Sequence, residues 1–264
     1  MTLLATCLLA GNALWAEPTS NFAQGAALLG RGAPFTAVRV LRLALAEGDS
    51  RAHFALAQAY FVLNQHRFFR EEIAEAKRNQ PSDAEPYYVE GRFLFQNESK
   101  FDAAATQFQK ALFRDPNHIK ALCYLGISLM NMQEPVEAEA HLLKAVEQIA
   151  QQKSSFYLPF QTLALLYIQQ DQLEKAAAAV DRAVALAPQV ALNQFLLGKI
   201  AWARNSPAGA IPALQAAIAL DDAFLEARYL LARILKSQGK TAEGERQLAQ
   251  FKALKEIYGV ASRQ

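Results

Sequence analysis

The segment ALCYLGISLMNMQEPVEAEAHLLKAVEQ, residues 121–148, contains two stretches of good helix formers separated by a short polar turn. In the first stretch a residue without a side chain, Gly126, lies among large apolar residues. In the second, Ala138, Leu142 and Ala145 are spaced by four and three residues, which places them on one helical face. The segment predicts two paired helices that approach closely at small residues, while large side chains fill the grooves.

This pattern returns along the chain with a period near 34 residues. The small residue of the first helix recurs seven times, with successive separations of 32, 34, 35, 38, 34 and 34 residues. These positions are Gly25, Ala57, Gly91, Gly126, Ala164, Gly198 and Ala232. A period of this length is typical of a solenoid of stacked helical hairpins. We expect repeats near residues 19–49, 50–83, 84–117, 118–153, 154–189, 190–222 and 223–258.

The pattern resembles the tetratricopeptide repeat family, most clearly in the units around Leu125-Gly126 and Leu163-Ala164. The second of these units also carries Tyr167, Ala176, Val180, Ala183 and Pro188. The resemblance spans roughly residues 19–258. It implies an all-α fold, a right-handed superhelical solenoid of about seven helical hairpins over residues 17–264.

Two departures from the repeat carry structural expectations. The separation of 38 residues between Gly126 and Ala164 exceeds the period by four, which is about one helical turn. We therefore expect the helix that begins at Pro135 to extend to about Lys153 and to keep its phase. Phe251 replaces a small residue in the last unit, and we expect it to cover the open end of the stack.

The first sixteen residues differ from the rest of the chain. Residues 1–16 carry no charge and are rich in leucine, and Glu17 and Pro18 follow them. The run is shorter than the ~20 residues that a membrane-spanning helix needs. It resembles the hydrophobic part of a bacterial secretory signal peptide, with Ala13 or Ala16 before the cleavage site. No Lys or Arg precedes the run, which leaves two alternatives open: a signal peptide whose start lies upstream of residue 1, or an apolar first helix in a cytoplasmic protein instead of periplasmic or secreted export.

The chain has two cysteines, Cys7 and Cys123. The residues before Cys7 resemble a lipoprotein box imperfectly, since Thr6 is unusual at that place. If residues 1–16 are removed, Cys123 has no partner for an internal disulfide, and packing alone must stabilise the fold.

The family resemblance implies that the first helix of each hairpin lines a concave groove. The groove-facing positions lie three residues before, one after and four after the small residue. The candidate partner-binding residues are Phe54, Gln58, Phe61, Tyr88, Arg92, Phe95, Ile127, Gln161, Phe195, Lys199, Trp202, Tyr229 and Arg233. The same rule also gives Cys123, Met130, Leu165, Ile168 and Lys236.

Aromatic residues and arginine are common binding anchors, so this face suits an extended or helical peptide with apolar anchors. Acidic ligand residues are expected opposite the cations Arg92, Lys199 and Arg233. The alternative is that the rings fill gaps between neighbouring helices and that the cations are simply solvated. The groove positions hold no Lys–Asn pair, so they do not support the clamp for a terminal carboxylate found in some family members.

The sequence offers no pattern for catalysis, metal binding or cofactor binding. Its four histidines form no metal-binding pair, Cys123 has no nearby histidine as a base, and no phosphate-binding loop occurs. A net charge of +2 without a long basic run argues against nucleic acid as a partner.

We therefore predict a non-enzymatic scaffold that binds another protein or peptide, with no cofactor, metal or integral membrane span. The alternative is an assembly subunit that forms oligomers through the ends or the outer face of the solenoid. An accessory domain of an enzyme is a third hypothesis.

Overall fold

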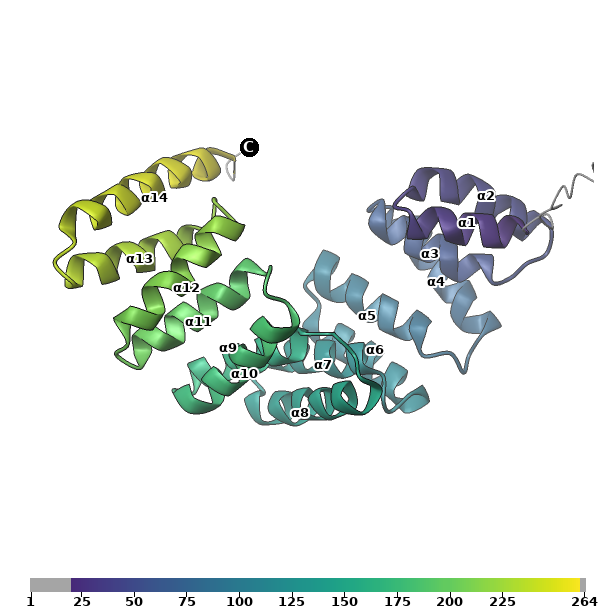
Figure 1. The fold of residues 1–264 in the computed structure, drawn as a ribbon. Helices are drawn as coiled ribbons and strands as arrows, with labels where there is room; N and C mark the ends of the chain where they lie inside the picture. Colours follow the sequence, from purple (N-terminus) through teal and green to yellow (C-terminus); the bar gives the residue numbers. More distant parts are fainter. Residues whose placement is uncertain (1–19, 262–264) are drawn as a thin grey trace, which may run out of the picture. The chain divides into compact units, whose positions relative to one another are not determined.

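A computed structural model describes residues 20–261, which form fourteen α-helices and no strand (Figure 1). The helices are α1 (Asn21–Gly30), α2 (Pro34–Ala46), α3 (Ala52–Val62), α4 (His66–Asn79), α5 (Glu85–Glu98), α6 (Phe101–Arg114), α7 (Ile119–Asn131), α8 (Pro135–Gln152), α9 (Leu158–Gln169), α10 (Leu173–Leu186), α11 (Ala191–Ala203), α12 (Pro207–Leu220), α13 (Leu225–Ser237) and α14 (Thr241–Ala261). The predicted all-α repeat fold is confirmed.

The helices pair in sequential order, as the repeat predicts. Within hairpins, α1 packs on α2, α3 on α4, α7 on α8, α9 on α10, α11 on α12, and α13 on α14. Compact packing divides the chain within α5: an N-terminal unit ends at Val89 and a C-terminal unit begins at Glu90. In the C-terminal unit the first helices α7, α9, α11 and α13 also contact one another in that order.

The small residues of the first helices let the paired helix approach closely. A Cβ atom added at Gly126 would lie 2.7 Å from Cγ of Leu142, and one at Gly198 would lie 2.7 Å from Cγ of Leu214. Such distances are shorter than van der Waals contact, so a larger residue would force the helices apart. The predicted pairing of small with large residues is therefore present in the packing.

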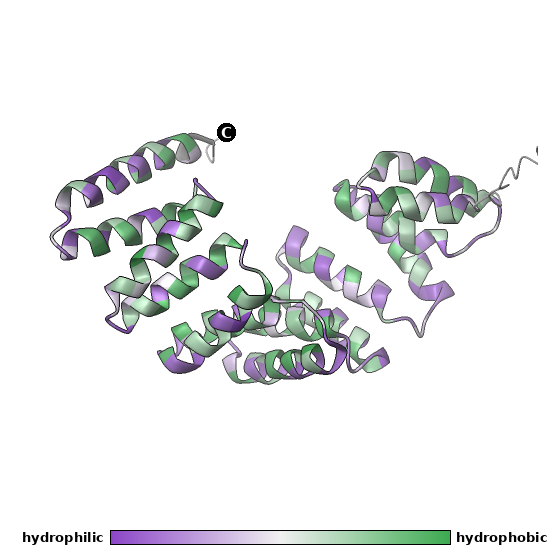
Figure 2. Ribbon diagram, in the orientation of Figure 1, coloured by the Kyte–Doolittle hydropathy of each residue, from purple (hydrophilic) through white to green (hydrophobic). Residues whose placement is uncertain are grey.

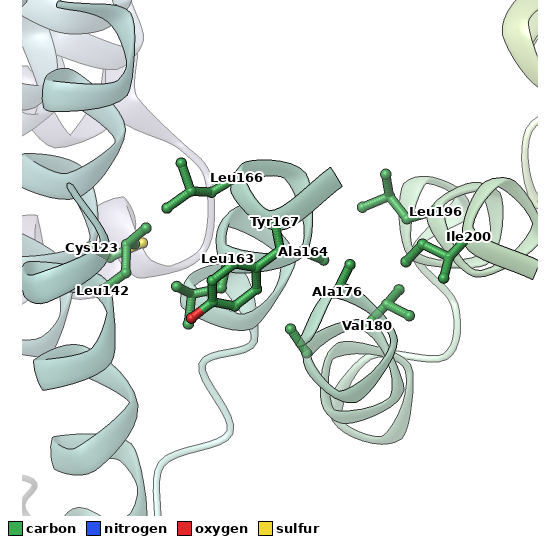
Figure 3. Packing of buried hydrophobic residues seen from close by; sticks show 11 residues of the cluster. Cys123, Leu142, Leu163, Ala164, Leu166, Tyr167, Ala176, Val180, Leu196 and Ile200 are labelled. Atoms are coloured by element: carbon green, nitrogen blue, oxygen red, sulfur yellow. The ribbon is translucent and has the colours of Figure 1, made fainter. Parts of the chain in front are cut away.

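The core of the C-terminal unit runs from one hairpin to the next. Figure 3 shows Cys123 and Leu142 on one side, and Leu196 and Ile200 on the other, of the buried residues of α9 and α10. The hydroxyl of Tyr167 donates to Oε1 of Glu139 at 2.8 Å, so the aromatic ring is buried while its polar end is satisfied. Side chains of neighbouring hairpins thus pack together in one continuous core, so that each hairpin stabilises the next.

Each hairpin turn contains one residue in the left-handed conformation. These residues are Gly32, Asn64, Ser99, Gln133, Asp171, Asn205 and Gly239, with φ between 51° and 76°. The next residue donates its backbone N–H back to the first helix, for example Gln172 to the Tyr167 carbonyl at 2.9 Å. This bond caps the helix end and reverses the chain.

The expected long helix is confirmed. α8 has 18 residues and ends at Gln152, and Lys153 terminates it in the left-handed conformation with a φ of 51°. Gln148 and Ile149 in the added turn are buried, so the helix keeps the same face toward its neighbours. An insertion of one turn is accommodated without a change of phase.

The last helix, α14, has 21 residues, and Figure 2 shows hydrophobic and hydrophilic positions alternating along it. The ring of Phe251 lies 5.4 Å from that of Tyr229, centroid to centroid. Phe251 therefore packs inside its own hairpin, against α13.

Within residues 20–261 no helix combines the length and hydrophobicity needed to cross a membrane. The predicted signal peptide, residues 1–16, lies outside the described residues, together with Cys7, Ala13 and Ala16.

Candidate functional site

A pocket of about 330 Å³ opens between the first helices α7 and α9. Its lining residues are Ile127, Met130, Asn131, Leu158, Gln161, Thr162, Leu165 and Gln169. Four of these, Ile127, Met130, Gln161 and Leu165, occupy groove positions expected from the sequence. The pocket has apolar walls with a few amides, a composition common in sites that bind an apolar side chain and fix its orientation.

The polar groups of this pocket are held by internal hydrogen bonds. Nε2 of Gln161 donates one of its two protons to Oδ1 of Asn193 on α11 at 2.6 Å, which leaves the second amide proton and the amide oxygen as the groups that could bond an occupant. Nδ2 of Asn131 donates to the Ile127 carbonyl at 2.9 Å. Thr162 likewise donates to the Leu158 carbonyl at 2.9 Å. These bonds fix the side chains and make the pocket a preformed feature.

Several groove positions are buried. Tyr88 is 4% exposed and Gln161 is 6% exposed, while Cys123 is fully buried. Burial raises the pKa of the Cys123 thiol, which keeps it protonated. The physical reason is that the position three residues before the small residue can face the neighbouring first helix, as Gln161 faces Asn193.

The aromatic groove residues of the C-terminal unit partly fill spaces between helices. Phe95 lies 5.2 Å from Phe101 between ring centroids, and Phe195 lies 5.0 Å from Phe224. Trp202 is half-buried against the core of α12 and α13. Tyr229 is the most open of the groove aromatics in this unit, with 45% of its surface exposed. The groove aromatics of the C-terminal unit therefore both pack between helices and leave part of their surface accessible.

The three groove cations differ in their surroundings. The guanidinium of Arg92 is half-buried, 5.7 Å from the ring centroid of Tyr124. Lys199 and Arg233 are exposed, and neither forms an ion pair with any residue that the structure describes. The Arg233 guanidinium lies 5.9 Å from the Tyr229 ring. Two accessible positive charges therefore lie on consecutive first helices.

The N-terminal unit has its own pocket, of about 420 Å³, between α1 and α3. It is lined by Phe22, Ala26, Leu29, Gly30, Arg51, Phe54, Ala55, Gln58 and Val62, which include the predicted groove residues Phe54 and Gln58. Phe61 packs its ring 5.7 Å from that of Phe69. The side chain of Arg51 hydrogen-bonds Asp49 at 2.7 Å and thereby lowers the pKa of that carboxyl.

Sequence reasoning missed Asn131, Leu158, Thr162 and Gln169 as lining residues. Asn131 and Gln169 both follow their small residue by five positions, which places them beside the predicted position at plus four on the same helical face. A rule that also counted the fifth residue after the small residue as groove-facing would have included Asn131 and Gln169. Among residues 20–261 no group of three or more His, Cys, Asp or Glu side chains could hold a metal ion.

Comparison with known proteins identifies the family. Residues 88–153, 162–224 and 195–251 match the tetratricopeptide repeat family model, which is more than half of the chain. The chain belongs to the tetratricopeptide repeat family, whose members generally mediate protein–protein interactions.

Two solved structures share the fold. PilF of Pseudomonas aeruginosa superposes with a TM-score of 0.71 at 21% identity, covering 81% of this chain and 96% of that one. PilW, a widely conserved type IV pilus biogenesis factor, gives a TM-score of 0.67 at 22% identity with the same coverage.

A sequence relative is the peroxisomal targeting signal receptor of Debaryomyces hansenii, 31% identical over 144 residues. The matched stretch covers 54% of this chain and 21% of the receptor. The chain therefore corresponds to about a fifth of the length of this relative.

Proposed function

We propose that this chain is a non-enzymatic adaptor that binds an extended protein segment along the exposed faces of its first helices. The observation that carries the proposal is the pocket between α7 and α9, which lies at positions expected to face a ligand. An apolar ligand side chain would enter between Ile127, Met130 and Leu165, while a ligand N–H would donate to the amide oxygen of Gln161. The similarity to a targeting-signal receptor supports peptide binding as the mode of action.

The pocket can be blocked without touching the outer face of the molecule. Random peptides displayed on phage would be selected against the whole chain, and the selected peptides measured by fluorescence anisotropy. Leu165→Lys should weaken their binding about tenfold or more, because a desolvated apolar anchor provides much of the affinity. Met130→Ala tests the same contact with a smaller change. Circular dichroism would verify that both variants fold.

Leu143→Lys is the matched control, since Leu143 lies on α8 outside the pocket and is 47% exposed. It should leave peptide affinity unchanged. Equal affinities for the wild type and both pocket variants would overturn the proposed function.

The outer faces of second helices support a second candidate, an assembly subunit. Phe113 on α6 is 87% exposed and Val136 on α8 is 79% exposed. Apolar side chains this open can mark association surfaces. Multi-angle light scattering at rising concentration tests the idea: a homo-oligomer that dissociates in Phe113→Ser supports it, whereas a monomer at every concentration rejects it.

Export is a further part of the proposal, and it rests on the uncharged leucine-rich residues 1–16. In a bacterial host the mature protein should be recovered from the periplasm or medium, beginning after Ala13 or Ala16. Amino-terminal sequencing would test this, and an intact amino terminus in the cytoplasm would refute it.

A further inference from the structure

We infer that the C-terminal unit selects ligands by a fixed spacing between one apolar residue and two acidic residues. The apolar residue enters the pocket between α7 and α9, and the acidic residues pair with Lys199 and Arg233. This inference rests on the proposed function, because it assumes that a peptide lies across the first helices.

The apolar and cationic features lie on consecutive helices of one compact unit. α7, α9, α11 and α13 contact one another in order. The hydrogen bond of 2.6 Å between Gln161 and Asn193 joins α9 to α11. The ring contact of 5.0 Å between Phe195 and Phe224 joins α11 to the N-cap residue that directly precedes α13. These contacts fix the distances that a ligand would have to span.

The charges favour an acidic partner. Arg204 pairs with Glu174 at 3.0 Å, and Lys236 lies 4.0 Å from Glu245. Lys199 and Arg233 have no such carboxylate among the residues described by the structure. Glu226 is exposed on α13, seven residues from Arg233, which is ~10 Å along a helix axis. An incoming carboxylate would therefore meet two accessible cations without displacing a carboxylate of this chain.

The helix spacing converts to a residue spacing. Packed helices lie about 8–10 Å apart, and an extended chain advances ~3.3–3.6 Å per residue. One step between neighbouring first helices therefore corresponds to about three ligand residues. The pocket lies between α7 and α9, about half a helix spacing before α9. Along an extended ligand, Lys199 on α11 is therefore about four ligand residues from the apolar anchor, and Arg233 on α13 is about seven.

The favoured ligand is an extended peptide with an apolar residue at position 0 and Asp or Glu near positions 4 and 7. A peptide that binds in the opposite chain direction would carry the same residues in reverse order, so both orders are tested. Leu is a suitable anchor because the pocket has apolar walls formed by Ile127, Met130 and Leu165. Surface charge pairs are weak individually, so we expect the two acids together to raise affinity about threefold to tenfold at low salt.

The experiment compares synthetic fluorescent peptides on the whole chain by anisotropy. Each peptide has one Leu in a Gly/Ser background, and the acids are placed at 4 and 7, at 2 and 5, or replaced by Gln, in both chain directions. The wild type should bind a peptide with acids at 4 and 7 about threefold to tenfold more tightly than the Gln peptide. Lys199→Glu/Arg233→Glu should abolish this preference, and a peptide with Lys at 4 and 7 should restore binding to that variant.

Lys110→Glu/Lys144→Glu is the matched control, since it changes the net charge equally at two exposed positions on the second helices α6 and α8. It should retain the preference for acids at 4 and 7. Equal binding of the peptides with acids at 2 and 5, or an acid preference that survives in Lys199→Glu/Arg233→Glu, would overturn the inference.

The two proposals fail in distinguishable ways. If all peptides, including the Gln peptide, bind equally and Leu165→Lys abolishes their binding, the pocket function stands and the spacing rule is wrong. If only the phage-selected peptides bind the wild type, the pocket function stands and the spacing rule is wrong. If neither these peptides nor any phage-selected peptide binds the wild type, both proposals are rejected.

Discussion

Gln161 and Asn193 form a buried hydrogen bond of 2.6 Å that joins two consecutive first helices, α9 and α11. Asn193 is fully buried, and its Nδ2 atom also donates to the carbonyls of Ala183 and Ala187, each at 3.1 Å. Both carbonyls lie at the end of α10. One amide side chain therefore connects three helices of the C-terminal unit.

Removing this amide should destabilise the fold. Asn193→Ala leaves Nε2 of Gln161 without its acceptor in the interior, and the expected loss is about 2–4 kcal/mol in the free energy of unfolding. Urea unfolding followed by circular dichroism measures it. The control Gln194→Ala removes a single exposed bond to the Pro188 carbonyl and should cost less than about 0.5 kcal/mol. Equal effects of the two changes would contradict the assigned role of Asn193.

A methyl group at Gly126 should also destabilise the chain. The added Cβ of Gly126→Ala would lie 2.7 Å from Cγ of Leu142 and 3.2 Å from the Ala138 carbonyl oxygen. We expect a loss of about 1–3 kcal/mol from overpacking, which outweighs the better helix propensity of alanine. In Gly209→Ala the nearest side-chain atom is 3.4 Å away, so this control should be neutral or slightly stabilising. Thermal unfolding of both variants provides the comparison.

The left-handed turn residues predict opposite effects of two substitutions. Gly239 has a φ of 76°, and Gly239→Ala should lower stability by about 1 kcal/mol because a Cβ atom is unfavourable there. Gln133 has a φ of 64° in the equivalent turn, so Gln133→Gly should raise stability by about 0.5 kcal/mol after the greater freedom of the unfolded chain is included. Melting temperatures that move in the same direction for both variants would contradict this assignment.

The hydroxyl of Tyr167 should make stability depend on alkaline pH. Burial, together with the hydrogen bond to Glu139, raises the pKa of Tyr167 from 10.0 to about 12. Below pH 10 the folded and unfolded chains both keep this proton. Between pH 10 and 12 the unfolded chain releases it first, so stability is lost as pH rises. In Tyr167→Phe this loss should be absent.

The measurement is the free energy of unfolding of both proteins between pH 9 and pH 11. At pH 9 the wild type should be the more stable by about 1–2 kcal/mol, and the difference should shrink at higher pH. A constant difference between the wild type and Tyr167→Phe would rule out the proposed linkage.

The repeat and the pairing of helices could be predicted from the sequence because side-chain volume alone encodes them. Gly126 opposite Leu142 is visible as a small residue followed sixteen positions later by a large one. The added turn of α8 followed from the same logic, since four residues complete about one turn. Contacts between paired helices that depend on the helical period can thus be predicted from the spacing of small and large residues in the sequence.

The backbone conformations of the turns and the exposure of the groove residues could not be predicted in this way. Ser99 and Gln133 adopt the left-handed conformation where backbone hydrogen bonds close the turn, although only glycine, asparagine and aspartate commonly indicate such a position in a sequence. Phe54 and Gln161 occupy the same position of their repeats and both line pockets, yet Phe54 is half-buried whereas Gln161 is only 6% exposed. How closely the neighbouring first helix packs determines how exposed a groove residue is. The periodicity of residues within one helix gives no information on that packing.

The bond from the Gln172 N–H to the Tyr167 carbonyl joins residues five positions apart, and its counterparts in the other hairpins join residues five or six positions apart. Most of what holds a hairpin is therefore close in the chain, which corresponds to a low contact order and rapid folding. A hairpin can form as soon as its own residues have emerged from the ribosome, before the rest of the chain has been synthesised. Nucleation can then occur in any strong hairpin and spread to its neighbours in both directions.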